Sequence, residues 1–196
     1  VLQRAVGAAS GQAVTYGLTA DDPVACSASF KAFQEADPAI SFAGFLPPSG
    51  RIECSSEAAP FNVGPPDRVR AIATSPLNAL IPRLRADAPG GATAVLTQPV
   101  VRDGEVIGQI VLTISTETLS AMPDLNNQTQ PLSLAIFNRD GDVITVQGER
   151  PVAQEEAMAE DTVRRLSTEP TSFVGQNADG KRRIFVVLTL VPDLAY

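Results

Sequence analysis

The sequence contains no histidine, and this absence removes several kinds of active site. Histidine is the usual general base near neutral pH and the commonest ligand for zinc or copper. A serine triad that relies on histidine is therefore excluded. A serine nucleophile would need a lysine partner instead, and the only lysines, Lys31 and Lys181, lie in no such motif.

Long apolar runs are also missing. The longest, over residues 184–191, is far shorter than the roughly 20 residues that a membrane-spanning helix needs, and no signal peptide opens the chain. Val1 lies inside an expected helix without a cap, and Tyr196 follows a strand and a short tail. We therefore expect both ends to be cuts within a longer protein.

Basic stripes and phosphate-binding loops are lacking as well. The 15 lysine and arginine residues are scattered in a chain of net charge −7, which argues against a nucleic-acid partner. Gly90 and Gly91 are not followed by Lys-Ser or Lys-Thr and precede a strand, so no nucleotide fingerprint is met. The acidic residues within 155–161 fit a solvated helix face better than a catalytic carboxylate pair. We expect no catalytic residues, no metal and no cofactor.

Cysteine is scarce, with Cys26 and Cys54 alone in the chain. A bridge between them would stabilise the fold by about 3.5 kcal/mol in the chain-entropy estimate and would indicate an oxidising compartment. Two buried free thiols are the alternative and need no function. The small polar residues beside both cysteines favour the bridge. Two thiolates without histidine or a third cysteine do not complete a tetrahedral metal site.

Hydrophobic spacing predicts helices at the start of the chain. Apolar residues within 2–16 recur at alternating steps of four and three, which is one face of a long helix. Asp22 and Pro23 begin a second helix that ends before Asp37. The first half is expected to continue with strands at 40–46, 51–55, 92–98 and 106–115, and with a proline-rich stretch at 56–90 that holds short helices near 67–73 and 77–85.

The second half repeats the order of the first. A polar segment over 122–131 suits a linker, after which Gly141 and Gly180 take the turn positions of Gly50 and Gly104. Its expected elements are strands at 132–137, 143–147, 173–176 and 182–191, and a helix at 153–166. The sequence thus predicts an α+β fold with two successive modules, 1–125 and 126–196.

The order of these elements resembles the PAS-like Cache sensory domains of bacterial transmembrane receptors. The resemblance is carried by the leading helix, by the hairpin over 40–55 with Gly50 at its turn and Cys54-Ser55-Ser56 at its end, and by the strand pair 99–115. The resemblance implies a long N-terminal helix followed by two PAS-like modules, each an antiparallel sheet with flanking helices. The first module would be membrane-distal. The smaller second module would be membrane-proximal.

In such domains a small ligand lies between the first sheet and the irregular crossover, here 56–90. The resemblance therefore implies that Arg68 and Arg70 bind a carboxylate. The pocket would be completed by the hydroxyls of Ser55, Ser56, Thr97 and Thr113 and by an apolar wall from Phe61. The alternatives are a solvated helix face for the arginines, a core anchor for Phe61, and ordinary strand positions for the threonines.

The resemblance implies the extracytoplasmic, periplasmic part of a bacterial inner-membrane receptor, such as a sensor histidine kinase. It would bind an unidentified small molecule without catalysis and relay binding through its terminal helix and strand to a cytoplasmic output domain. The alternative is a protein-interaction or adhesion module without a small ligand. A homodimer through the N-terminal helix and a membrane attachment through segments outside this sequence are further expectations.

Overall fold

The computed structural model of the protein describes residues 1–19, 22–57, 59–82, 93–115, 118–119, 133–148, 171–176, 182–192 and 194–195. These residues belong to two compact units, Val1–Thr118 and Leu119–Tyr196. The predicted module boundary at residue 125, the predicted linker over 122–131 and the predicted helix over 153–166 lie outside the described residues.

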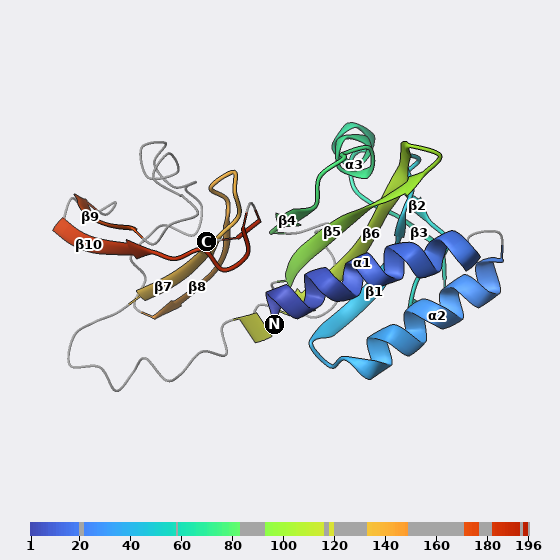
Figure 1. Ribbon diagram of the computed structural model, residues 1–196, viewed down its shortest axis with the longest axis horizontal. Coiled ribbons are helices and arrows are strands. Elements are labelled where there is room, and N and C mark those ends of the chain that lie inside the picture. Colours follow the sequence, from blue (N-terminus) through green and yellow to red (C-terminus); the bar gives the residue numbers. More distant parts are fainter. Residues whose placement is uncertain are drawn as a thin grey trace. The chain divides into compact units, whose positions relative to one another are not determined.

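Two helices open the first unit and pack on the same sheet (Figure 1). Helix α1 spans Leu2–Thr19, and α2 spans Pro23–Ala36. Asp22 caps α2, because its Oδ1 accepts hydrogen bonds from the backbone nitrogens of Val24 and Ala25, both at 3.0 Å. Proline at the first helical position and the extended backbone at Asp37 fix the two ends of α2. The helix predicted over 23–36 is confirmed.

The sheet of the first unit is antiparallel and has the strand order β1-β6-β5-β4. Strands β5 and β6 are joined by Asp103 and Gly104, both with positive φ (52° and 84°), as the Asp-Gly pattern predicts. The strands span Ile40–Leu46 (β1), Ala79–Ile81 (β4), Thr93–Arg102 (β5) and Glu105–Ser115 (β6).

The outer edge of β1 is lined by the segment that follows the first turn. The backbone nitrogen of Phe45 donates to the carbonyl of Cys54 at 3.0 Å, and that of Ser56 donates to Ala43 at 2.8 Å. The predicted hairpin partner over 51–55 therefore runs beside β1. Its first residues, β2 (Arg51–Ile52), instead pair with β3 (Phe61–Asn62).

Within its described residues, the proline-rich crossover over 56–90 contains one helix and two short strands, β3 and β4. Helix α3 spans Pro66–Ala73, as predicted. The short helix predicted over 77–85 is wrong, because its described part forms β4 on the edge of the sheet. Leu80, opposite Leu96 of β5, is only 1% exposed. Burial and backbone pairing against β5 outweigh the weak helical preference of this segment.

The sheet buries side chains on both faces. On β1, Phe45 stacks on Tyr16 of α1 with ring centroids 4.0 Å apart. Phe42, three residues earlier, points to the opposite face and belongs to a cluster that contains Val69 and Ala73 of α3. Helices α1 and α2 thus cover one face, and α3 covers the other.

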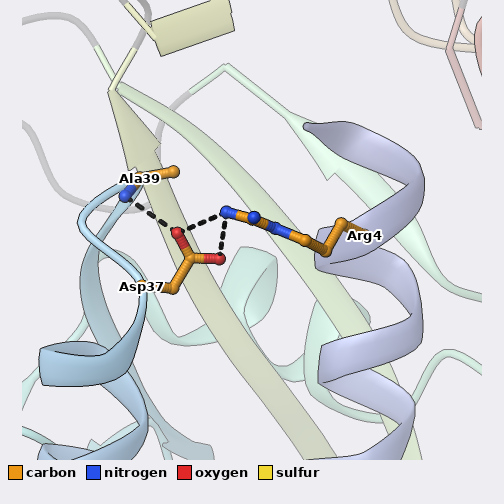
Figure 2. Close-up of polar contacts among 3 residues, drawn as sticks. All are labelled: Arg4, Asp37 and Ala39. Carbon is orange, nitrogen blue, oxygen red and sulfur yellow. Dashed lines mark hydrogen bonds and ion pairs between the residues drawn. The ribbon is translucent and has the colours of Figure 1, made fainter.

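One ion pair joins the first turn of α1 to the residue that follows α2 (Figure 2). Arg4 Nη2 lies 2.7 Å from Asp37 Oδ1 and 2.8 Å from Oδ2, and Oδ1 also accepts from the backbone nitrogen of Ala39 at 3.1 Å. The Arg4 side chain is 68% exposed, so solvent screens the pair, which contributes about 0.2–1 kcal/mol.

Within its described residues, the second unit holds two antiparallel strand pairs. Strand β7 (Ser133–Phe137) pairs with β8 (Val143–Gly148), and β9 (Thr171–Gln176) pairs with β10 (Arg182–Val187). The side chain of Asn138 closes the β7–β8 turn, because its Oδ1 accepts from the backbone nitrogens of Asp140 at 3.0 Å and Asp142 at 2.8 Å. The first three strands agree with the predicted ones to within two residues, whereas the strand predicted over 182–191 ends at Val187. A complete second PAS-like module stays a prediction.

Candidate functional site

The α3 face of the sheet carries the candidate site. Side chains alternate along a strand, so Gln109, Val111 and Thr113 of β6 point to one side. Val111 lies in the cluster with Val69 and Ala73 of α3. The crossover predicted to cover a ligand therefore lies over this face.

Three of the predicted hydroxyl residues are buried on this face. Thr97 lies opposite Val111, and Thr113 lies opposite Phe42 and Val95. Thr97 and Thr113 are 1% and 7% exposed, and Ser55, beside Gly44 of β1, is 3% exposed. The structure thus brings Ser55, Thr97 and Thr113 together on one surface of the sheet.

Two of these hydroxyls already have hydrogen-bond partners within the chain. Thr97 Oγ1 accepts from the backbone nitrogen of Ala79 at 3.2 Å and donates to its carbonyl at 3.5 Å. Ser55 Oγ accepts from the backbone nitrogen of Glu57 at 3.2 Å. Both hydroxyls hold neighbouring segments against the sheet, so each would share its bonding capacity with any ligand.

Phe61 and Ser56 contribute mainly to local structure. Phe61 is half-buried and meets Phe42 edge-on, with ring centroids 5.7 Å apart and an angle of 64° between the planes. It packs against the α3 cluster and so acts as a core anchor. The Ser56 hydroxyl accepts from the backbone nitrogen of Ala43 at 3.1 Å, which fixes the edge of β1.

Arg68 and Arg70 are exposed on α3, one on each side of Val69, which is buried against the sheet. This position fits the solvated helix face that the sequence left open as an alternative. It also leaves two guanidinium groups on the helix that covers the candidate face. Arg68 and Arg70 are the two cations of α3, and each is adjacent in sequence to Val69.

Gln109 is the polar residue of this face that the sequence reasoning missed. It is fully buried, and its Nε2 donates to the carbonyl of Ser75 at 2.7 Å. Among the described residues, its Oε1 is the only buried side-chain nitrogen or oxygen without a hydrogen-bond partner. The sequence did contain a signal, because an amide shares the alternating face of Val111 and Thr113.

A cleft of about 280 Å³ lies on the other side of the sheet and includes Tyr16, Phe45, Arg51 and Glu53 among its lining residues. Arg51 Nε and Glu53 Oε1 are 3.0 Å apart, and both side chains are more than half exposed. Their charges neutralise each other in solvent. The α3 face, where buried polar groups converge, is the stronger candidate.

The cysteines have a structural role. Cys26 of α2 and Cys54 beside β1 form a disulfide with their Cα atoms 5.8 Å apart, which confirms the predicted bridge. Both residues are buried. Within the described ranges, no group of three or more histidine, cysteine, aspartate or glutamate side chains is arranged to hold a metal ion.

No family model matches the chain, and no curated protein matches it by sequence. Solved structures do match its fold. The extracellular domain of a protein assigned as a histidine kinase superposes with a TM-score of 0.61 at 16% identity, over 92% of this chain and 81% of that domain.

The ligand-binding domain of the Pseudomonas fluorescens chemoreceptor CtaA is similar to the chain as well. Its complex with L-serine superposes with a TM-score of 0.59 at 16% identity, over 93% of this chain and 79% of that one. Its complex with L-leucine gives a TM-score of 0.60 at 16% identity, over 93% and 77%. The resemblance to extracytoplasmic sensory domains is thus confirmed at the level of the fold. No helix in the described part of the chain is both long and apolar enough to cross a membrane.

Proposed function

We propose that this chain is the extracytoplasmic ligand-sensing domain of a membrane-bound bacterial receptor and that it catalyses no reaction. The observation that carries this proposal is the fold shared over 92% of the chain with an extracellular domain assigned to a histidine kinase. The Cys26–Cys54 disulfide supports an oxidising, periplasmic location. Ligand binding would shift a two-state equilibrium that an output domain reads.

We propose further that the receptor is a histidine kinase or a related transducer with two sensory modules, 1–125 and 126–196. The signal would pass through α1 and the C-terminal strand to a cytoplasmic output domain. The two compact units, divided at Thr118, support a two-part organisation.

The proposed ligand is a small amino acid or a similar zwitterion. The neighbouring CtaA domain holds L-serine and L-leucine. In this chain Arg68 and Arg70 would bind the carboxylate, because guanidinium groups pair with carboxylates in a bidentate manner. The remaining contacts would come from Ser55, Ser56, Phe61, Thr97 and Thr113.

A panel of L-amino acids tested by thermal shift examines this proposal. A compound that binds only the folded state stabilises it by about 2.7 kcal/mol at roughly 100 times its Kd, so at least one should raise Tm clearly. We expect Arg70→Ala to raise the Kd of that compound about tenfold, because a charge-assisted hydrogen bond is lost.

Arg102→Ala is the matched control, since Arg102 is also exposed and is the last residue of β5, next to the Asp103 turn. It should leave the Kd unchanged. Equal weakening by both variants would show that only overall charge matters. A panel without any stabilising compound would count against the sensing proposal.

A homodimer through α1 would have to use the outward side of the helix. The apolar face of the helix over 2–16 packs on the sheet, where Leu2 and Ala9 are 6% and 0% exposed. Val14 is 72% exposed and lies on the outward side. We expect Val14→Glu to shift a self-associating sample toward monomer in sedimentation velocity. A wild-type monomer at high concentration would contradict the homodimer.

A further inference from the structure

Gln109 carries a buried acceptor that the protein itself does not use. Gln109 lies on β6 and is 0% exposed, and its backbone lies between Leu46 of β1 and Pro99 of β5. Buried side-chain oxygens nearly always have a hydrogen-bond partner. The Oε1 atom is the exception among the described residues.

The orientation of this amide is fixed by its neighbour. The Ser75 carbonyl 2.7 Å away can only accept a hydrogen bond, so the amide nitrogen must face it and Oε1 must point elsewhere. Rotating the amide would set two acceptors against each other. The free acceptor is therefore a consequence of the Ser75 contact.

The polar groups around Gln109 leave this acceptor without a donor. Pro99, directly opposite in β5, has no backbone N–H. The Ser75 hydroxyl donates to the carbonyl of Leu77 at 3.1 Å and accepts from its backbone nitrogen at 3.2 Å. Oε1 is thus the acceptor of this group that is left free, and it suits a ligand that brings an N–H donor.

We infer that Gln109 Oε1 accepts a hydrogen bond from an ammonium or amide N–H of the bound ligand and so selects ligands that carry such a donor. This inference rests on the proposed sensing function and adds a specificity-determining residue to it. Because Nε2 holds Ser75, two residues after α3 ends, the same amide would link the ligand to the position of α3.

Calorimetric titration with two matched ligand pairs tests the inference. L-Leucine is compared with isocaproate and L-alanine with propionate, since each acid equals its partner without the amino group. Wild-type protein should bind one or both amino acids at least about tenfold more tightly than the matching acid. In Gln109→Met, which keeps length and removes the whole amide, including the acceptor Oε1 and the donor to Ser75, that ratio should fall toward one.

The control is Gln98→Met, the same chemical change on β5. Gln98 pairs with Ile110 and points to the opposite face from Gln109, so its variant should keep the wild-type ratio. Circular dichroism of each variant establishes that it is folded before titration.

The outcomes separate this inference from the proposed function. Tight binding of an amino acid with an unchanged ratio in Gln109→Met would overturn the role of Gln109 and leave the sensing function intact. Equal or tighter wild-type binding of the carboxylic acids would do the same. Failure of every compound to bind wild-type protein would count against both.

Discussion

Removal of the Cys26–Cys54 disulfide is expected to lower the free energy of unfolding by about 3.5 kcal/mol. The bridge joins residues 28 positions apart in sequence and ties α2 to the segment that lines the edge of β1. Without it, the unfolded chain regains the entropy of an open loop. Urea denaturation of the Cys26→Ser/Cys54→Ser variant, followed by circular dichroism, measures the loss.

The reductant provides an internal control for this prediction. Wild-type protein should lose stability when a phosphine reductant is added, whereas the double variant should not respond. A wild-type midpoint that is the same with and without reductant, under conditions where mass spectrometry shows free thiols, would contradict the stabilising role. Because both cysteines are buried, complete reduction requires partial unfolding or long incubation.

The elements that could be predicted from the sequence are those whose signals are local. Helix α2 was placed at both ends because an aspartate cap, a first-turn proline and an Asp-Pro stop act within a few residues of each end. The β5–β6 hairpin was found because Asp103 and Gly104 supply a turn between two alternating strands. Such signals need no knowledge of the rest of the fold.

Elements that depend on distant partners were missed. Strand β4 is three residues long, and it is a strand because its backbone pairs with β5 from Ala79 to Ile81. Gln109 could not be singled out from the sequence, since nothing local indicates that Ser75 lies over it. Burial by a segment 34 residues away in sequence is a property of the tertiary fold.

The candidate site shows the same division. Thr97 and Thr113 were selected because the resemblance to Cache sensory domains places a ligand over the first sheet, and the structure puts both on the face under α3. Their hydrogen bonds could not be predicted, because Thr97 meets Ala79 only after β4 joins the sheet. The buried polar groups of this face thus depend on how the crossover folds back, which is also where a sensor would register its ligand.

Gly108→Ala is expected to destabilise the first unit by about 1–3 kcal/mol, because the core has no room for one more carbon. A Cβ atom at Gly108 would lie 2.6 Å from the backbone carbonyl oxygen of Leu46 and would also overlap the ring of Phe45. That ring is stacked on Tyr16 of α1, so it cannot withdraw without loosening α1. The backbone of β1 would have to move away from β6.

The same substitution at Gly7 is the matched control and should have the opposite sign. Gly7 is exposed on α1, and a Cβ atom there meets nothing within 4 Å. Alanine lowers the entropy lost on helix formation, so Gly7→Ala should stabilise the protein by about 0.5–1 kcal/mol. Urea midpoints that shift in opposite directions would tie the Gly108 effect to packing between β1 and β6. A stability of Gly108→Ala equal to that of wild type would mean that β1 and α1 separate easily, and the stacked rings would then contribute little to the core.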